Sequence, residues 1–348
     1  MKAWVLHDIG DIRYEEWATP SPGEGEVLVA IKAAGICGSD IPRIYRDGAH
    51  QMPLVPGHEF AGQVVALGDD VDEAWREMRV GVFPLIPCRE CLPCQKKQYE
   101  MCKHYSYLGS RTDGGFAEYV VVPQRNLIAL PDNVTFEQAA MLEPMAVAVH
   151  AMRRIEPRTT DVVVVCGLGT IGMLLVMMLL EKGVTNILVI GNKASQKEKV
   201  LALGVPDANY CDSKSMDVRK WVLEQTDGYG ADAFFECVGK NETVLEAIDL
   251  ASPAGAVCLV GNPYSDMVLD KQTYWKILRN QVRLTGTWNS SFTGASDDDW
   301  HYVLDLLARG RIHPQQLISH RFQLPDLEQG MHIMRDKSEE YMKVMAVI

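Results

Sequence analysis

The chain has 348 residues, 47% of them hydrophobic, so it is long enough for two domains with separate cores. Its formal net charge of −12 disfavours binding to nucleic acid or to anionic membranes, both of which attract basic surfaces. The N-terminus has no apolar segment of signal-peptide length, and the longest apolar run, residues 171–180, is shorter than the roughly 20 residues that span a bilayer. We therefore expect a cytoplasmic protein that binds neither nucleic acid nor membranes.

The first 145 or so residues predict a mixed, largely antiparallel lobe. Short β-rich runs at 27–31, 63–67 and 117–122 are separated by glycine and proline. This composition is typical of strands joined by tight turns, with few long helices.

From about residue 161 the periodicity changes to strand, helix, strand. The apolar run 162–165 suits a strand buried on both faces; a helix follows to about residue 182, and a strand at 186–190. Further predicted elements are strands at 231–236, 256–260 and 282–285, helices at 297–310 and 325–336, and a last strand at 344–348. The alternation predicts a doubly wound parallel sheet, and hence an α/β fold class.

Four cysteines lie within fifteen residues, at Cys88, Cys91, Cys94 and Cys102. Four thiolates at this spacing can close a tetrahedral shell around one zinc ion, with no position left for water. A closed site of this kind is structural. We interpret the other buried cysteines as reduced core residues, since disulfides are rare in cytoplasmic proteins.

A glycine-rich loop, Gly167-x-Gly169-x-x-Gly172, follows the apolar strand and opens a helix that starts with Thr170 and Ile171. The first glycine allows a tight turn, the second lets a pyrophosphate approach the backbone, and the third lets helix and strand pack closely. The helix N-terminus supplies amide hydrogens to phosphate groups. The loop predicts dinucleotide binding, with a plain strand–turn–helix as the alternative.

The end of the next strand bears on cofactor choice. An NAD site places Asp or Glu there to bind the ribose hydroxyls, but this chain reads Gly191-Asn192-Lys193. A carboxylate would repel a 2′-phosphate, whereas an amide and a cation can bind it with charge-assisted hydrogen bonds. We expect NADP to be favoured over NAD; the alternative is that these residues form a solvated turn and NAD binds without the acid.

A second group of metal-ligand types is spread over the first half of the chain, at Cys37, His58 with Glu59, and Glu143. One thiolate, one imidazole and one carboxylate can hold zinc with a fourth position free for a substrate oxygen, whose pKa the metal lowers. Each residue also has a plain structural interpretation: core packing, a hydrogen-bonded buried histidine, and a helix-end acid. Spacing alone does not decide between them.

The segment Gly57-His58-Glu59-x2-Gly62-x5-Gly68-x2-Val71 resembles the signature of the zinc-containing alcohol dehydrogenases, in the medium-chain dehydrogenase/reductase superfamily. Segments 35–43, 48–50 and 109–119 resemble the polyol dehydrogenases within it, and most of all the galactitol-1-phosphate 5-dehydrogenase group. The resemblance implies a β-rich, GroES-like catalytic domain from residues 1–149 and 287–348, with a Rossmann domain at 150–286. It also implies a homodimer or homotetramer.

The same resemblance implies roles for individual residues. Cys37, His58 and Glu143 would bind the catalytic zinc, and Glu59 would lie beside it as an intermittent ligand. Ser39 would pass the substrate proton outward, and Asp40 would orient His58 from behind, as metal-bound imidazoles commonly need. Further cofactor contacts are implied at Val238, Gly239, Gly261 and Thr287. The departure from the NAD-using polyol dehydrogenases is Gly191, where those enzymes carry Asp.

We therefore expect an oxidoreductase with two zinc ions per chain, one catalytic and one structural. It would transfer hydride between a secondary hydroxyl of a polyol or polyol phosphate and NAD(P). Arg43 and Arg111 are candidates for gripping a substrate phosphate, since guanidinium binds phosphate in a bidentate way; ordinary surface salt bridges are the alternative. Two other functions stay open. One is a secondary-alcohol dehydrogenase or ketone reductase for non-phosphorylated substrates, and the other is a non-catalytic, zinc-stabilised nucleotide-binding protein.

Overall fold

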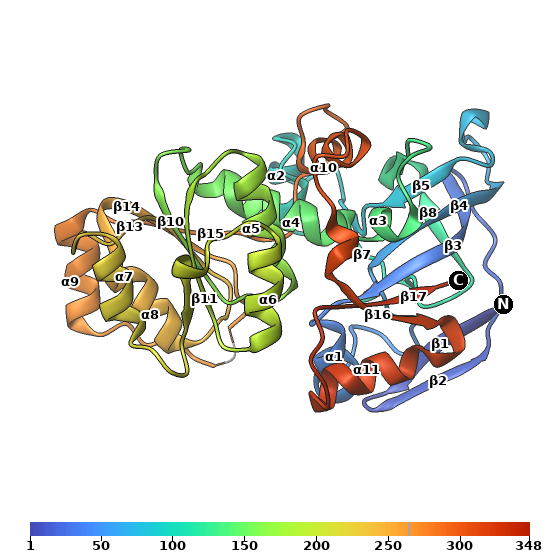
Figure 1. The fold of residues 1–348 in the computed structure, drawn as a ribbon. Helices are drawn as coiled ribbons and strands as arrows, with labels where there is room; N and C mark the ends of the chain where they lie inside the picture. Colours follow the sequence, from blue (N-terminus) through green and yellow to red (C-terminus); the bar gives the residue numbers. More distant parts are fainter. Residues whose placement is uncertain (264) are drawn as a thin grey trace. The chain divides into compact units, whose positions relative to one another are not determined.

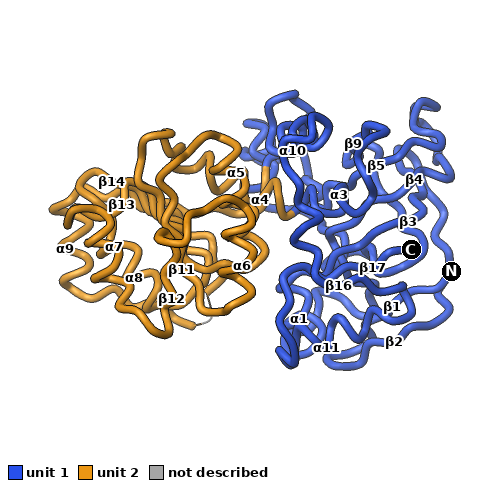
Figure 2. Tube along the Cα trace, viewed as in Figure 1, with its two compact units in different colours: residues 1–143, 291–348 blue, residues 144–290 orange. Residues whose placement is uncertain are grey.

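A computed structural model describes residues 1–263 and 265–348 and divides the chain into two compact units (Figure 1, Figure 2). Unit 1 comprises residues 1–143 and 291–348, and unit 2 comprises residues 144–290. The sequence-based domain limits lie at 149/150 and 286/287. Each unit has its own sheet and its own cluster of buried hydrophobic side chains.

Unit 1 is built on a seven-stranded, mostly antiparallel sheet in the order β16-β17-β3-β4-β5-β9, with β8 also paired to β3. Its strands are β3 (Glu26–Ile36), β4 (Glu59–Leu67), β5 (Arg79–Val82), β8 (Tyr119–Pro123), β9 (Leu127–Ala129), β16 (Ile318–Gln323) and β17 (Lys343–Val347). The last strand, β17, pairs antiparallel with β3, with Val344 opposite Ile36. The two ends of unit 1 therefore meet in one sheet, although the whole of unit 2 separates them in sequence.

The remaining elements of unit 1 are short. Unit 1 also has two two-stranded antiparallel sheets: the hairpin of β1 (Lys2–Asp8) with β2 (Asp11–Glu16), and the pair of β6 (Leu85–Ile86) with β7 (Ser106–Tyr107), which encloses the cysteine loop. The helices are α1 (Asp40–Pro42), which continues as a π-helix (Arg43–Asp47), α2 (Leu92–Gln95), α3 (Phe136–Ala140), α10 (Asp299–Ala308) and α11 (Leu327–Asp336). The sequence analysis did not predict the N-terminal hairpin.

Unit 2 has a six-stranded parallel sheet in the order β12-β11-β10-β13-β14-β15. The strands are β10 (Val162–Cys166), β11 (Asn186–Gly191), β12 (Tyr210–Asp212), β13 (Ala231–Glu236), β14 (Ala251–Leu259) and β15 (Arg283–Gly286). The helices are α4 (Leu142–Ile155, which begins two residues before the unit boundary), α5 (Thr170–Glu181), α6 (Ala194–Ala202), α7 (Val218–Gln225), α8 (Asn241–Asp249) and α9 (Lys271–Asn280). The prediction of an α/β fold with a doubly wound sheet is confirmed.

The strand order of unit 2 reverses at β10, because the chain passes from β10 outward to β12 and then returns to β13. Helices α5 and α6 consequently lie on one side of the sheet and α7 to α9 on the other (Figure 1). Ligands of such sheets bind beyond the carboxyl ends of the strands at this reversal. Within the described part of the chain, no helix combines the length and the apolarity that crossing a membrane would require.

Candidate active site

The pairing of β3 with β4 brings one group of metal-ligand types together in unit 1. Cys37 directly follows β3, and Glu59 opens β4 after His58; Gly35 and Glu59 lie opposite each other in the ladder. One ligand atom from each of Cys37, His58 and Glu59 lies within 4.8 Å of the others. His58 and Glu59 are buried, at 4% and 2% exposure. We call these three residues the mixed-ligand group.

Asp40 lies behind His58 and is fully buried. Its Oδ2 accepts a hydrogen bond of 3.0 Å from the Cys37 amide, and its Oδ1 accepts one of 2.5 Å from Nη1 of Arg43. The same Oδ1 is 3.3 Å from His58 Nδ1, within ion-pair distance although the angle does not meet hydrogen-bond geometry. Asp40 therefore links the loop after β3 electrostatically to Nδ1 of the imidazole, and a carboxylate behind the ring is a common neighbour of metal-binding histidines.

The electrostatics of the mixed-ligand group suit a cation. Burial by itself raises the pKa of the Cys37 thiol, but the neighbouring His58 outweighs it, so the pKa is lowered overall. Burial likewise opposes protonation of His58, yet Asp40 and Cys37 raise the pKa of its imidazole to about 10. A half-buried thiolate close to a buried imidazole and a buried carboxylate offers sulfur, nitrogen and oxygen donors of the kinds that zinc binds, so the residues fit a zinc ion.

Two further predicted residues lie near this group. The Ser39 hydroxyl donates to Cys37 Sγ at 3.3 Å and is half-buried. Glu143, the second residue of α4, is 7% exposed and accepts a hydrogen bond of 3.2 Å from the Tyr107 hydroxyl. Burial raises the pKa of Glu143, while the nearby His58 and the Tyr107 hydroxyl oppose that rise.

Sequence analysis missed two residues of this region. The ring of Tyr107 lies 5.7 Å from that of His58, edge to face, so Tyr107 contacts both His58 and Glu143. Lys343, in β17, is 2% exposed, and its ammonium group donates to the carboxylate of Glu59. The only signal for Lys343 was one charged residue in the otherwise apolar segment 342–348.

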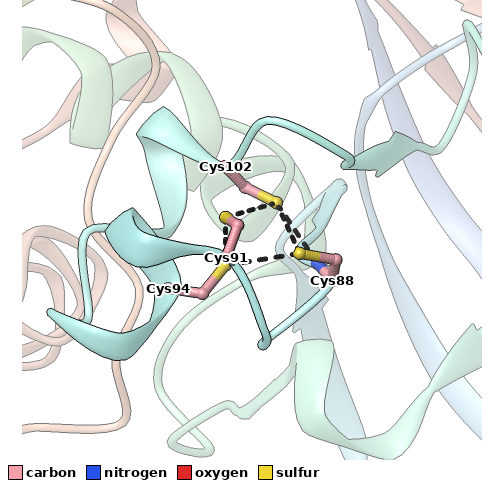
Figure 3. A group of neighbouring side chains, drawn as sticks. All are labelled: Cys88, Cys91, Cys94 and Cys102. Carbon is pink, nitrogen blue, oxygen red and sulfur yellow. Dashed lines mark hydrogen bonds between the residues drawn. The ribbon is translucent and has the colours of Figure 1, made fainter.

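The four cysteines form a second group, which we call the four-cysteine cluster (Figure 3). Their sulfur atoms point toward one another, with Sγ–Sγ distances between 3.5 and 4.0 Å. Backbone amides of Lys103 and Cys94 lower the pKa of Cys91 to about 6, whereas burial raises that of Cys94 to about 12. With four sulfur donors and no other ligand type in the group, the arrangement fits a closed zinc site.

The glycine loop connects β10 to α5 in unit 2. Gly167 has φ +96°, and a Cβ there would lie 2.6 Å from the Val238 side chain. A Cβ at Gly172 would lie 2.0 Å from the Gly167 carbonyl oxygen, so helix and loop touch there. Gly169 caps α5, and an added Cβ would meet nothing within 4 Å. The space next to Gly169 is therefore open at the N-terminus of α5, which is where a pyrophosphate binds in loops of this kind.

The other predicted cofactor residues follow neighbouring strands at the same edge of the parallel sheet. The amides of Val238 and Gly239 both donate to the buried Glu236 carboxylate, at 2.8 and 2.9 Å. A Cβ at Gly261 would lie 2.2 Å from the Gly239 nitrogen, so the loops after β13 and β14 touch. Thr287 follows β15, and its amide donates to Leu259. All four residues share the carboxyl-end edge with the glycine loop.

The turn after β11 contains Gly191, Asn192 and Lys193. Gly191 is closely surrounded: a Cβ there would lie 2.9 Å from the Tyr210 hydroxyl and 3.0 Å from Leu168 Cδ1. Asn192 is exposed, and Lys193 is half-buried at the N-cap of α6. The glycine therefore lets the turn pack against Tyr210, and the polar residues after it stand beside a helix N-terminus.

The two predicted phosphate ligands differ in how they are connected to the mixed-ligand group, Arg43 through Asp40 and Arg111 through two tyrosine rings. Arg43 is paired with Asp40, and the guanidinium of Arg111 lies over the ring of Tyr105, 4.6 Å from its centroid. Among the residues that the structure describes, Arg111 forms no ion pair, and its buried Nε has no hydrogen-bond partner. The pKa of His50 is lowered, first by burial and then by the positive charges of Arg111 and Arg43. Both arginines therefore lie close enough to His50 to act on it electrostatically.

Comparison with known proteins agrees with both halves of this arrangement. Residues 23–132 match the family described as alcohol dehydrogenase GroES-like domain, and residues 170–309 match the zinc-binding dehydrogenase family. Galactitol 1-phosphate 5-dehydrogenase of Escherichia coli K12 is 33% identical over 92% of both chains. Sorbitol dehydrogenase of Halalkalibacterium halodurans is 31% identical over 99% of this chain and 98% of the relative.

Solved structures show the same fold over the whole chain. Galactitol-1-phosphate dehydrogenase from Escherichia coli superposes with a TM-score of 0.92 at 31% identity, and each chain is covered completely. A zinc-binding dehydrogenase from Sinorhizobium meliloti 1021 bound to NADP and an alcohol dehydrogenase from Escherichia coli CFT073 in complex with NADH give TM-scores of 0.91 and 0.90, at 27% and 28% identity. Each comparison covers 100% of this chain and 99% of the other.

The signature around His58, the glycine loop and these matches agree. The chain belongs to the zinc-dependent medium-chain alcohol and polyol dehydrogenases, a family of NAD(P)-dependent oxidoreductases.

Proposed function

We propose that this dehydrogenase transfers hydride between a secondary hydroxyl of a polyol phosphate and NADP, with a catalytic zinc ion bound by Cys37, His58 and Glu143. The observation that carries the proposal is the half-buried Cys37 thiol beside the buried His58 imidazole in the mixed-ligand group, with the buried Glu143 carboxylate close enough to act on His58 electrostatically. A zinc ion there supplies Lewis acidity that lowers the pKa of an alcohol substrate. A second zinc ion, in the four-cysteine cluster, has a structural role.

The protein groups around the metal have separate tasks. Asp40 keeps the His58 ring oriented, because its carboxylate is fixed on the opposite side by Arg43 and by the Cys37 amide. The Ser39 hydroxyl, half-buried beside Cys37, accepts the proton that the substrate hydroxyl releases and passes it to solvent. Tyr107 keeps Glu143 in place through its hydroxyl.

A phosphorylated substrate is supported by the basic residues near this group. Arg111 carries a charge that no described carboxylate neutralises, and ring contacts lead from it through Tyr105 and Tyr107 to His58. A guanidinium whose charge is not neutralised by a carboxylate can bind a phosphate through two parallel hydrogen bonds. The substrate named for the Escherichia coli relative, galactitol 1-phosphate, supports the same class.

A non-phosphorylated secondary alcohol is the second candidate substrate. It is favoured by the ion pair of Arg43 with Asp40, because the charge of Arg43 is then already neutralised and is less available to bind a substrate phosphate. The sorbitol dehydrogenase relative supports this candidate.

The preference for NADP rests on the turn after β11. Lys193 is the N-cap residue of α6, so a cationic residue stands in the sequence next to the free amides of the first helical turn, where a ribose 2′-phosphate would be bound. The small residue at position 191 leaves no carboxylate to repel that phosphate. Related structures hold either cofactor, NADP in one and NADH in the other, so the likeness to them does not itself select one, and the proposal depends on the turn.

A homodimer or homotetramer is supported by the edge of the unit 2 sheet. Strand β15 ends the sheet with exposed residues, and large apolar side chains are exposed on α9, on β15 and two residues after it: Tyr274, Trp275, Leu278, Leu284 and Trp288. An open strand edge beside exposed apolar side chains is a surface that proteins usually cover. A second copy of the chain would cover it.

The substrate is tested by initial rates with galactitol 1-phosphate and with galactitol, each with NADP and NAD. Arg111→Met should raise KM for the phosphorylated substrate by about tenfold or more, the loss of a charged hydrogen bond, and leave KM for galactitol unchanged. Arg89→Met is the matched control, since Arg89 also stacks on a tyrosine ring, that of Tyr99. An equal effect of Arg111→Met on both substrates would exclude phosphate binding by Arg111.

The cofactor is tested at Lys193. Lys193→Ala should lower kcat/KM with NADP by roughly tenfold, the equivalent of about 1.5 kcal/mol, and change that with NAD far less. Lys199→Ala, on the same helix, is the control. Gly191→Asp should reverse the preference, and it should be made together with Tyr210→Phe, because the Tyr210 hydroxyl occupies the space of a new side chain. A wild-type enzyme that is more efficient with NAD contradicts the proposal.

A further inference from the structure

Lys343 contributes an unusual buried charge to the mixed-ligand group. It opens β17, and its Nζ donates to the Ile36 carbonyl oxygen at 3.0 Å and to Oε2 of Glu59. Lysine and glutamate are each 2% exposed. A Cβ added to Gly35 would lie 2.5 Å from the Glu59 carboxylate and 2.7 Å from Lys343 Cε. The pair is therefore pressed against the backbone of β3, where the absence of a side chain at Gly35 makes room for it.

The charges around the mixed-ligand group form separate pairs. Asp40 is neutralised by Arg43, and Glu59 by Lys343. Both carboxylates are almost completely buried, where an uncompensated charge is strongly unfavourable. Among the residues described, this pairing leaves two negative ligands for a divalent metal, the Cys37 thiolate and Glu143. The two positive charges of a metal dication bound by Cys37, Glu143 and neutral His58 are then neutralised without the carboxylate of Glu59.

We propose that Lys343 is a positioning residue that holds the Glu59 carboxylate away from the metal, and so keeps a coordination position open for the substrate oxygen. This inference rests on the proposed function, since it concerns the same metal. Without the lysine, the buried carboxylate of Glu59 would need another cation. The bound metal would be the nearest one, because Glu59 already belongs to the group whose ligand atoms lie within 4.8 Å.

The test replaces zinc by cobalt(II), whose visible absorption reports the number and type of its ligands. The cobalt spectrum of the four-cysteine cluster is measured on His58→Ala and subtracted. Lys343→Met should then give weaker absorption bands from the mixed-ligand group, as an added carboxylate raises the coordination number. It should also slow metal release to a chelator by roughly tenfold, and lower kcat more than it changes KM.

Two further variants isolate the charge. Lys343→Arg keeps a cation beside Glu59 and should restore most of the wild-type spectrum. Lys343→Met combined with Glu59→Gln removes both charges and should restore the spectrum and the rate of metal release. A spectrum of Lys343→Met identical to wild type would overturn the inference, as would a failure of the double variant to restore it.

Glu59→Gln alone keeps the test decisive if Lys343→Met does not fold. If Lys343 keeps the carboxylate off the metal, removing that carboxylate should leave the cobalt spectrum unchanged; a changed spectrum means that Glu59 is a resident ligand and overturns the inference. The proposed function is judged separately. A wild-type protein that binds no cobalt outside the four-cysteine cluster refutes the catalytic metal, whatever the variants do.

Discussion

The two groups of metal-ligand side chains in unit 1 are assembled in different ways. The four-cysteine cluster comes from one loop of fifteen residues that contains only short helical turns, so local backbone geometry suffices to bring the sulfur atoms together. Cys37 and His58 come from the ends of two strands, and Glu143 from the start of α4. The mixed-ligand group therefore exists only when β3 and β4 are paired, and Glu143 comes near it only when α4 is in place.

The surroundings of the two groups differ as well. The four-cysteine cluster contains one ligand type, and backbone amides tune its thiols. The mixed-ligand group is held by ion pairs with buried carboxylates: Asp40, behind His58, pairs with Arg43, and Glu59, a member of the group, pairs with Lys343. A closed site stabilises a loop, whereas an open site needs neighbours that keep one position free. The contrast predicts that substitutions in the two groups have separable effects.

The largest effect is expected for His58→Ala. Loss of a ligand from the open site removes the Lewis acid, which contributes several kcal/mol, so kcat/KM should fall by about a thousandfold or more. The melting temperature should stay near that of wild type, because the four-cysteine cluster is intact. Steady-state kinetics and calorimetry check this, with His332→Ala, a half-exposed histidine, as control. An active His58→Ala enzyme would contradict the assignment of catalysis to the mixed-ligand group.

Whereas His58→Ala mainly lowers activity, Cys94→Ser should mainly lower stability and zinc content. It leaves three thiolates around the structural metal, and we expect zinc to fall from about two equivalents to about one and the free energy of unfolding to fall by at least about 2 kcal/mol. Elemental analysis and denaturant titration measure both. Cys211→Ala, at a fully buried cysteine in unit 2, should retain both metals. One zinc ion in the wild type would refute the two-site reading.

The pH dependence of zinc uptake sharpens the comparison further. Because burial raises the pKa of Cys94 to about 12, its thiol is protonated near neutral pH, and zinc must displace that proton. The affinity of the four-cysteine cluster should therefore rise with pH, by about tenfold per unit for each proton released. Below about pH 6 the dependence should become steeper, since Cys91 is then protonated too. Chelator competition on His58→Ala protein isolates this site; an affinity independent of pH would contradict the mechanism.

The smallest effect is expected for Tyr107→Phe. The hydroxyl that donates to Glu143 is lost, while the ring against His58 stays. We expect roughly threefold to tenfold weaker metal binding at the mixed-ligand group, the loss of one hydrogen bond, and no change at the four-cysteine cluster. Tyr99→Phe is the matched control, since its hydroxyl accepts from Arg89 and from no metal-ligand residue that the structure describes, and it should leave metal binding at the mixed-ligand group unchanged. Metal release from both groups at once would mean that they are not independent.

Much of this protein could be predicted from patterns that are local in sequence. The α/β class followed from the change of hydrophobic period near residue 161, and the family from the segment around His58. The N-terminal hairpin and the short strand β12 were missed, because three to seven residues without a strong alternation carry little signal. The ends of predicted elements also differ from the observed ones by a few residues, as helix and strand ends depend on capping contacts.

What the sequence by itself determined is the chemistry that short spacings encode: a cage of four cysteines, a glycine loop between strand and helix, and a cysteine and a histidine beside strand ends. Only the tertiary structure showed that Lys343 lies on Glu59, 284 residues away, and that Tyr107 contacts both His58 and Glu143. Such contacts arise from the pairing of β17 with β3 and from the packing of separate loops. The physical reason is that a buried charge is tolerated only when its partner is placed beside it, and strand pairing across the whole chain decides which residue that partner is.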